Sequence, residues 1–346
     1  MARSKKRETE EIIDAVNKPV DTPYLTKEVS VDQVVSTGSS LLDLAISGKR
    51  RRGGGIPGGI IVELYGPSGG GKSALAAEIC AASQKKGGDV RFCDPEARLD
   101  QEYSQIYGVS LGNSFEYYRP NTVSEMFNDY LWNWEPKNEN VINVFVGDSV
   151  AALSTDVEMD EEDKMGMRRA KEFSAGLRKT ARLIANKNWL VVFTNQVRQS
   201  PTGEVTPGGM GLPFYSSLRI RVGPPFANSK IKKSATVAGS KLEKVIGINS
   251  VCKITKSSVD EPYREAMISI IFNYGLDTIR SELQYYKDMT GESSYNCFDG
   301  KTCASMQSAI AHIEENNLEE QLRERTIDLW ENIESKFEVS RKTKTR

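Results

Sequence analysis

The chain has 346 residues, of which 38% are hydrophobic and 27% charged, and its formal net charge at pH 7 is −1. These values fit a globular protein with one large core and argue against a surface coated in positive charge for nucleic acid, although local basic patches remain compatible with them. No apolar run approaches the roughly 18 residues of a membrane-spanning helix, and no apolar region follows the basic start MARSKKRETEE. We therefore expect no signal peptide, no membrane partner and a cytoplasmic location.

The five cysteines are scattered and form no CxxC pair, and His312 is the only histidine. A structural zinc site needs a cluster of such residues, and a catalytic triad needs a histidine near its nucleophile. The sequence therefore predicts neither a zinc site nor histidine-based catalysis.

The first 35 residues are predicted to form an N-terminal arm rather than a domain. Residues 8–17 show a short acidic helical pattern, which Pro19 and Pro23 end. A helix of this length is marginal alone, so we expect the arm to pack against another subunit. From Ser36 the sequence predicts a capped helix, followed by the basic cluster Lys49–Arg52, for which we expect a role in DNA or partner binding.

Residues 60–82 carry the strongest motif of the chain, an apolar strand, a glycine loop and an alanine-rich helix. The loop matches the full phosphate-binding pattern that ends in lysine and serine. Glycines allow backbone N–H groups to converge on phosphate oxygens, and the helix N-terminus adds a positive dipole. The lysine supplies charge to the outer phosphates, and the serine hydroxyl can ligate Mg²⁺. The loop residues predicted to bind the phosphates of a nucleotide are Gly66, Pro67, Ser68, Gly69, Gly70, Gly71, Lys72 and Ser73, with Ser73 also predicted to bind the metal.

Apolar strands alternate with helical patterns through residue 194, which predicts an α/β fold with a mainly parallel twisted sheet flanked by helices. Beyond about residue 200, strands follow one another with little helix, so we expect this half to be more antiparallel. The predicted strands cover residues 89–93, 141–147, 190–194, 218–222, 251–255 and 268–272, and the longest predicted helices cover residues 122–134 and 168–187. We expect a core at residues 36–287 and a small α+β C-terminal domain with a basic tail at residues 288–346, built from a strand-and-loop segment and helices near 303–314 and 318–337.

Two carboxylates follow predicted strands and would complete a nucleotide site. Asp148 ends one strand beside the glycine loop, where it can hold Mg²⁺ directly or through water. Glu96 follows the strand at residues 89–93, where it can orient or deprotonate a water molecule. Asp94 and Asp100 compete for this role, and a cluster that only caps a helix is a further alternative.

The strand at residues 190–194 ends in Asn195 and Gln196 and leads into a polar loop that contains glycine. A neutral amide at this position can sense a γ-phosphate through a hydrogen bond, and the loop can move when that bond forms or breaks. A simple surface connection is the alternative interpretation.

Together, these segments resemble the RecA family of recombinases, with features similar to the phage UvsX type, from about Ser36 into the C-terminal region. Helicases and transport ATPases share the glycine loop but not the series that follows it. The matching segments are STGSSLLDLA, GPSGGGKS, FCDPEARLD followed by Tyr103, VGDSVAALS, Met165-Gly166, LRKTARLIANKNWLVVFTNQVR, PGGMGLPFYSSLRI and YNCFDGKTCASM.

The resemblance implies a RecA-like core and a DNA-dependent ATPase that forms a homo-oligomeric helical filament on single-stranded DNA and pairs it with homologous double-stranded DNA. It implies catalytic roles for four residues: Lys72 in the ATP loop, Glu96 as the water-activating base, Gln196 as the switch between the γ-phosphate and DNA, and Lys256 at the ATP of the next subunit. Asp148 is implied as the second Mg²⁺ element. Asp100 and Tyr103 match the adenine contacts of the family.

DNA contacts are implied for two loops, at about residues 154–165 and 198–212, and for the helix between them. The implied DNA-binding residues are Met165, Lys171, Arg178, Arg198, Gly208 and Gly209. Phe214 and Lys256 match subunit-interface positions, and single-strand-binding and loader proteins are further candidate partners.

The chain departs from the family pattern at several positions. Ser258 stands where a second lysine is usual, and Pro201 stands where an apolar residue usually wedges between bases. The basic insertion and the basic tail also differ from bacterial members, which together with the UvsX-like features suggests a phage enzyme acting in host cytoplasm. The alternatives on the same core are a hexameric helicase-like motor and an ATP-switched protein that coats DNA.

Overall fold

A computed structural model describes residues 33–99, 104–156, 166–201, 203–207, 209–224, 229–238, 240–339 and 341 of the chain. These residues belong to one compact unit, Val31–Arg346. Nearly all of the expected N-terminal arm lies outside the described residues, as do Asp100, Tyr103, Met165 and Gly208.

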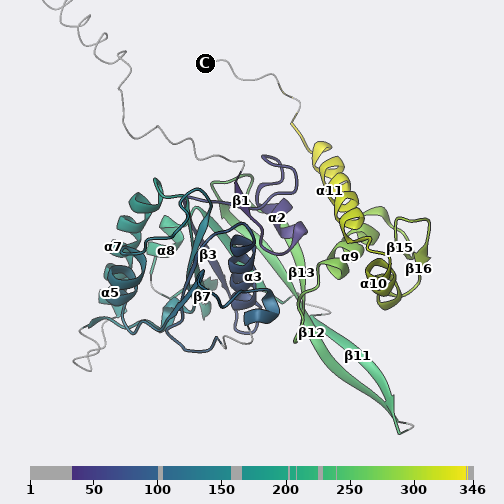
Figure 1. Cartoon of the computed structure of the whole chain (residues 1–346), viewed down its shortest axis with the longest axis horizontal. Helices are drawn as coiled ribbons and strands as arrows, with labels where there is room; N and C mark the ends of the chain where they lie inside the picture. The colour runs from purple at the N-terminus through teal and green to yellow at the C-terminus, as the bar shows by residue number, and fades with distance from the viewer. Residues whose placement is uncertain are drawn as a thin grey trace, which may run out of the picture. The chain divides into compact units, whose positions relative to one another are not determined.

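The main sheet has the strand order β14-β13-β12-β10-β3-β7-β6-β4-β5, with β11 paired to β12 (Figure 1). Its strands are β3 (Ile60–Gly66), β4 (Val90–Cys93), β5 (Phe115–Tyr118), β6 (Asn143–Gly147), β7 (Trp189–Gln196), β10 (Leu218–Gly223), β11 (Lys230–Val237), β12 (Ser240–Ser257), β13 (Glu265–Ile271) and β14 (Gly275–Leu276). All neighbours from β10 to β5 pair in parallel, whereas the pairs that involve β11, β12, β13 and β14 are antiparallel. The predicted α/β fold, parallel first and antiparallel later, is confirmed.

Helices cover both faces of the parallel half of the sheet. On one face, α2 (Ser40–Ser47) and α3 (Lys72–Lys85) pack in the larger hydrophobic cluster, and on the other α7 (Gly166–Ile184) packs with α5 (Val123–Glu125) and its continuation Met126–Leu131. Strand β3 alternates between them, because Val62 and Leu64 enter the first cluster and Ile61 the second. Burial on both faces explains why the strands read as continuous apolar runs.

The remaining elements include several that the sequence patterns did not predict. The segment predicted as a helix at 122–134 contains a π-helical stretch, Met126–Leu131, and β5, α9 and the two-stranded pairing of β11 with β12 are also additions. The other elements are β1 (Val34–Val35), β2 (Ile56–Pro57), 3₁₀ turns at Gln105–Tyr107 and Val150–Ala152, β8 (Arg198–Ser200), β9 (Gly203–Val205), α8 (Gly211–Tyr215), α9 (Thr278–Thr290), β15 (Tyr295–Asn296), β16 (Thr302–Cys303), α10 (Met306–Glu315) and α11 (Glu319–Ser335).

The C-terminal region has a hydrophobic cluster of its own, built from α9, α10, the start of α11 and the β15–β16 pair. Two residues of α11, Ile327 and Trp330, pack against Leu44 of α2. The region is α+β, as predicted.

The basic insertion before β3 binds α11. The Arg52 guanidinium contacts three carboxylates on that helix, Glu331 at 2.7 Å, Glu324 at 2.9 Å and Asp328 at 2.7 Å. Lys49 pairs with Glu261 at 2.6 Å. Part of the charge that the sequence suggested for DNA is therefore neutralised within the chain. Within the part of the chain that the structure describes, no helix combines the length and apolar composition needed to cross a membrane.

Candidate functional site

The glycine loop lies between the carboxyl end of β3 and the N-terminus of α3, at the edge where the parallel strands end. Position 66 requires glycine, because a Cβ there would lie 2.0 Å from the Val222 carbonyl oxygen. Gly71 has a φ of 95°, and a Cβ on it would meet Ile270 at 2.3 Å. No side chain caps the first turn of α3, so its backbone N–H groups remain available to an anion.

Lys72 and Ser73 open α3 and face into the site. Lys72 is 9% exposed, and its ammonium group donates to the carbonyl oxygens of Gly66 at 3.0 Å and Pro67 at 2.8 Å. Burial lowers the pKa of Lys72, and the nearby carboxylates of Asp148 and Glu96 oppose that shift. The residues predicted for the loop, the metal and the base are thus close in space.

Asp148 lies at the end of β6 with an almost fully buried carboxylate. It accepts hydrogen bonds from the Ser73 hydroxyl, 2.9 Å from Oδ2, and from the Thr194 hydroxyl at Oδ1. Burial raises the pKa of Asp148, Asp94 raises it further, and the two hydroxyls and Lys72 oppose this. Ser73 and Asp148, the two predicted metal residues, therefore meet directly. Thr194 was not singled out in the sequence.

The strand β4 leads into the turn that carries Glu96. Glu96 Oε2 is buried without a hydrogen-bond partner among the described residues, and its Oε1 lies 3.3 Å from Arg98. Asp94 accepts from the Leu99 backbone N–H at 2.7 Å and from the Tyr117 hydroxyl at 3.0 Å. Asp94 Oδ2 thus holds the turn in shape, while Asp94 Oδ1 and Glu96 Oε2 are both buried without a hydrogen-bond partner among the described residues.

The amides that end β7 lie next to the glycine loop. In the parallel pairing of β3 with β7, Gly66 is the register partner of Gln196, and Tyr65 that of Asn195. The buried Asn195 amide donates to Glu63 at 3.2 Å and to the Pro207 carbonyl oxygen at 3.1 Å. Gln196 thus begins the second loop one strand away from the phosphate-binding loop.

Glu63 is a buried carboxylate that the sequence reading missed. It lies in β3 with no exposed surface and accepts from Arg219 Nε at 2.5 Å. Burial raises the pKa of Glu63, and Arg219 is the main opposing charge. Arg219 also lies 4.4 Å from the centroid of the Tyr65 ring. A single charged residue inside the apolar run IIVELYG was the signal that could have identified Glu63.

Lys256 lies on β12, on the side of β10 opposite β3, and contacts Phe214 of α8. Lys256 Nζ donates to the carbonyl oxygens of Pro213 at 2.9 Å and Phe214 at 2.8 Å. The Phe214 ring is 72% exposed. Lys256 is thus bound to α8 rather than to the glycine loop of its own chain.

Of the residues predicted to bind DNA, those that the structure describes lie on α7, on β8 and just before α8. Lys171 and Arg178 are exposed on α7, and Arg178 donates to the Tyr215 hydroxyl at 3.0 Å. Arg198 is exposed on β8, which pairs with β9 so that the second loop begins as a small hairpin. Gly209, at φ 74°, approaches Ala170 of α7 closely, since a Cβ would lie 3.1 Å from it.

ATP with Mg²⁺ fits the residues present. The uncapped helix start, the glycines at close approaches, and the buried lysine suit phosphate, and the adjacent Ser73 hydroxyl and Asp148 carboxylate are oxygen ligands of the kind Mg²⁺ prefers. Among the described residues, no cluster of three or more histidine, cysteine, aspartate or glutamate side chains could hold a metal. The metal would therefore depend on phosphate oxygens for further ligands.

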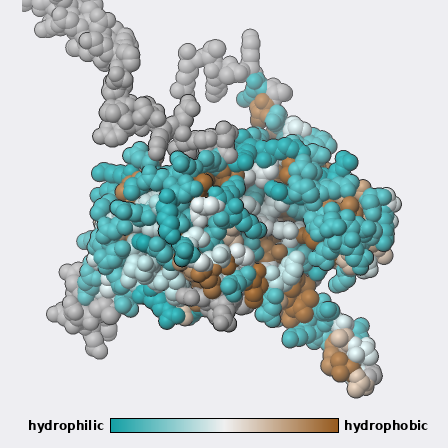
Figure 2. All heavy atoms as spheres, viewed as in Figure 1, coloured by the Kyte–Doolittle hydropathy of each residue, from teal (hydrophilic) through white to brown (hydrophobic). Residues whose placement is uncertain are grey.

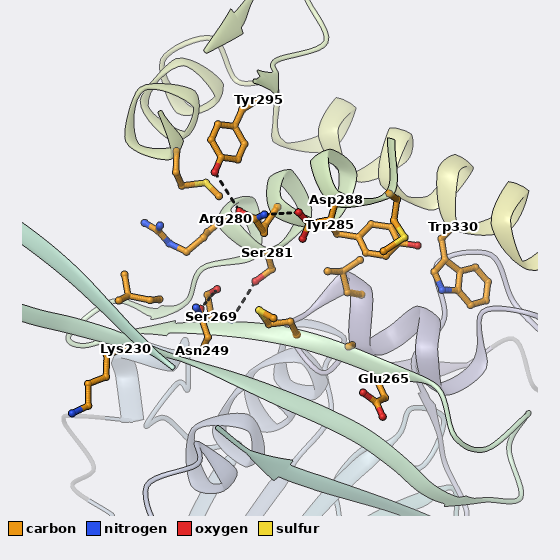
Figure 3. Close-up of a pocket in the computed structure, with 17 residues that line it drawn as sticks. Lys230, Asn249, Glu265, Ser269, Arg280, Ser281, Tyr285, Asp288, Tyr295 and Trp330 are labelled. Atoms are coloured by element: carbon orange, nitrogen blue, oxygen red, sulfur yellow. Dashed lines mark hydrogen bonds between the residues drawn. The ribbon is translucent and has the colours of Figure 1, made fainter. Parts of the chain in front are cut away.

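A separate cavity of about 550 Å³ lies between the antiparallel strands and the helices α9 and α11 (Figure 3). Its walls include Met267, Met289 and Tyr285, and Ser281 accepts from the Ser269 backbone N–H at 3.2 Å within it. No residue of the glycine loop lines it. The cavity therefore does not belong to the candidate nucleotide site.

The fold and the loop define a phosphate-binding-loop α/β protein with a RecA-like core. Residues 23–277 match the sequence profile of the RecA N-terminal domain. "Protein RecA" of Thermus thermophilus is 33% identical over 292 residues, covering 81% of this chain and 80% of the relative. "Protein RecA" of Synechocystis sp. is 32% identical over 85% of this chain and 82% of the relative, and that of Deinococcus radiodurans is 32% identical over 85% and 79%. The chain belongs to the RecA family of recombinases.

Proposed function

We propose that the chain is a DNA-dependent ATPase that forms helical filaments on single-stranded DNA and catalyses homologous pairing and strand exchange. The observation that carries this proposal is the register of β3 with β7, in which Gly66 pairs with Gln196. The first residue of the phosphate-binding loop and the residue that opens the second loop are thus neighbours in one rigid sheet. A nucleotide bound at the phosphate-binding loop can therefore change the conformation of the second loop through directly adjacent residues.

We assign the ATP contacts to Gly66–Ser73 and the Mg²⁺ contacts to Ser73 and Asp148. When bound, Mg²⁺ would neutralise charge that develops on the phosphates. Lys72 adds a positive charge. Burial lowers the pKa of Lys72, so a nearby anion would stabilise its charged form. Glu96 is the candidate base, since its Oε2 has no hydrogen-bond partner among the described residues and can accept from a water molecule.

We further propose that Phe214 and Lys256 lie at a subunit interface. Phe214 is 72% exposed, and Lys256 donates a hydrogen bond to the Phe214 carbonyl oxygen. An exposed aromatic side chain of this kind suits a surface that a second copy of the chain covers. Lys256 would exchange its bonds to Pro213 and Phe214 for the ATP of the neighbouring subunit. Lys171, Arg178, Arg198 and Gly209 would contact single-stranded DNA, and a cytoplasmic location follows from a DNA substrate.

The test is ATP hydrolysis by the full chain with and without single-stranded DNA, followed by strand exchange between a circular single strand and a linear duplex. We expect hydrolysis to rise with DNA and joint molecules to form only with nucleotide. A Glu96→Gln variant should bind ATP and lose turnover. Hydrolysis that ignores DNA, or rings in place of filaments by electron microscopy with an ATP analogue, would contradict the proposal.

A further inference from the structure

Strand β11 and the first part of β12 form a two-stranded ribbon that extends away from the rest of the sheet (Figure 1). We call residues 230–238 and 240–247 the lysine ribbon. Lys232 to Val237 pair with Val245 to Ser240, and only from Gly247 onward does β12 also pair with β13. The outer half of the ribbon is therefore supported by no third strand, and its residues are exposed on both faces.

The lysine ribbon concentrates positive charge in a chain that is nearly neutral overall. It carries five lysines against one acid, Glu243, whereas the whole chain has a net charge of −1. Lys232 pairs with Glu243 at 2.8 Å, and this contact lowers the pKa of Glu243. In the part of the chain that the structure describes, Lys233, Lys241 and Lys244 form no ion pair.

The register puts two of these lysines directly opposite each other. Lys233 is the cross-strand partner of Lys244, so both side chains leave the same face of the ribbon. Like charges at opposite positions destabilise a strand pair, and an isolated two-stranded ribbon is marginal in water. A polyanion that lies along this face would remove the repulsion, whereas no acid of the described ribbon does so.

The tip adds apolar surface to the same face. Ala235 is the cross-strand partner of Leu242, and Val237 and Leu242 are each 55% exposed. Figure 2 shows brown, hydrophobic spheres near the end of the ribbon. The face that carries Lys233 and Lys244 is therefore basic toward the base of the ribbon and apolar at its tip.

These features suit double-stranded DNA. The major groove is about 12 Å wide and about 8.5 Å deep, and it admits a two-stranded ribbon. Paired lysines near the base of the ribbon would meet phosphates at the groove edge, and small apolar side chains at the tip can contact thymine methyl groups. An acidic protein could pair with the lysines equally well. A flat protein surface, however, has no groove that a projecting two-stranded ribbon could enter.

We propose that the lysine ribbon is a duplex-binding element that enters the major groove and contacts the backbone through Lys233 and Lys244. This inference rests on the proposed function, since a strand-exchange protein must take up a duplex partner. It assigns that contact to residues outside the loops around α7 and α8.

The experiment uses the full chain, a fluorescently labelled duplex and fluorescence anisotropy over a series of salt concentrations. We expect Lys233→Ala/Lys244→Ala to weaken duplex binding about tenfold and to reduce the log–log salt slope by up to about 1.8, since each phosphate contact contributes about 0.9. The matched control removes two exposed lysines elsewhere, Lys85→Ala/Lys336→Ala, and should bind like the parent. Lys233→Arg/Lys244→Arg should restore binding.

Dimethyl sulfate footprinting separates groove entry from backbone contact, because the reagent methylates guanine N7 in the major groove. The parent chain should protect guanine N7, and the double alanine variant should not. Polyglutamate, titrated against the parent chain and the double alanine variant, serves as a probe for an acidic protein partner. Unchanged duplex affinity of the variant, unchanged N7 protection, or loss of polyglutamate binding with duplex binding retained would each overturn the proposal.

Measuring ATP hydrolysis stimulated by single-stranded DNA distinguishes failure of the duplex-binding proposal from failure of the proposed function. The double alanine variant should retain it within twofold, which also shows that the variant is folded. An equal loss of this stimulation would mean that the ribbon serves the single strand, and the inference would be wrong. Failure of the parent chain to show stimulation would instead contradict the proposed function.

Discussion

Glu78 on α3 supports a prediction about pH that can be worked from the structure. Its carboxylate accepts the Leu276 backbone N–H at 3.3 Å and lies close to Gly38, where a Cβ would come within 2.7 Å of Oε2. Burial raises the pKa of Glu78 from 4.5 to about 7, against the opposing effects of the Leu276 backbone hydrogen bond and the charge of Lys85. The folded chain therefore holds this proton more tightly than the unfolded chain does.

The sign follows from proton linkage. Between pH 4.5 and about 7 the folded state binds more protons at Glu78, so the free energy of unfolding falls as the pH rises through this window. From pH 5 to pH 8 the contribution of this group to the free energy of unfolding falls by about 2 to 3 kcal/mol. Glu78→Gln keeps the shape and the acceptor oxygen but does not titrate. Relative to the parent, the free energy of unfolding of this variant should rise by the same amount over this interval.

The assay is urea denaturation of parent and variant at pH 5, 6, 7 and 8, followed by tryptophan fluorescence. Asp43 and Glu282 also have pKa values raised by burial, to about 6 and about 7, but they are common to both chains and cancel in the difference. A Lys85→Ala control should enlarge the pH effect, since the opposing charge is gone. A difference between parent and variant that stays constant from pH 5 to pH 8 would refute the reasoning.

Three further predictions concern the site and the C-terminal region. Lys72→Ala should lower ATP hydrolysis at least about a hundredfold in a coupled assay, because the transferring phosphoryl charge loses its clamp; near-normal turnover would contradict the site. Thr194→Val should lower the free energy of unfolding by about 2 kcal/mol in urea, since the buried Asp148 carboxylate loses a hydrogen bond, while Thr194→Ser should stay close to the parent. Arg52→Ala should speed amide hydrogen exchange in α11 with little change in α3, and equal rates in both chains would show that the three carboxylate contacts do not hold the helix.

Local sequence was sufficient for the parallel core and for the placement of several candidate site residues. The glycine loop is encoded by adjacent residues, and Asp148, Glu96 and Gln196 were singled out because each comes at the end of an apolar strand, at the same sheet edge. Asp148 and Ser73 do lie within hydrogen-bond distance of each other. Their placement could be predicted because, in a parallel sheet, the carboxyl ends of the strands meet at one edge.

Elements that depend on distant partners were not predictable. The lysine ribbon is exposed on both faces, so it lacks the alternation of apolar and polar residues that identifies a half-buried strand. The β8–β9 hairpin is tied to β10 by a bidentate pair of Arg221 with Glu204, at 2.7 Å for each bond, which no local pattern reveals. Helix α9 is different, since Asp277 caps its start and Gly291 ends it at φ 72°, and these local signals could have predicted it.

The basic insertion shows that part of a charge run can serve the fold. Lys49–Arg52 suggested DNA or partner binding, which stays a prediction, and Arg52 is surrounded by carboxylates of α11 that lie more than 270 residues later in the sequence. Those carboxylates recur along one helical face at positions 324, 328 and 331, a spacing that is ordinary for a solvent-exposed helix. Only the fold pairs the two segments.

The glycines of the phosphate-binding loop also set limits for laboratory evolution of this chain. At Gly66 a side chain would collide with the Val222 carbonyl oxygen of β10, so the backbone itself closes this position. At Gly71 the φ of 95° is the main restriction, since the nearest atom is the end of the Ile270 side chain. Gly69 meets nothing within 4 Å and is restricted only by its φ of 73°, which asparagine tolerates. A library that seeks a new nucleotide preference should therefore vary Gly69 and leave Gly66 and Gly71 fixed.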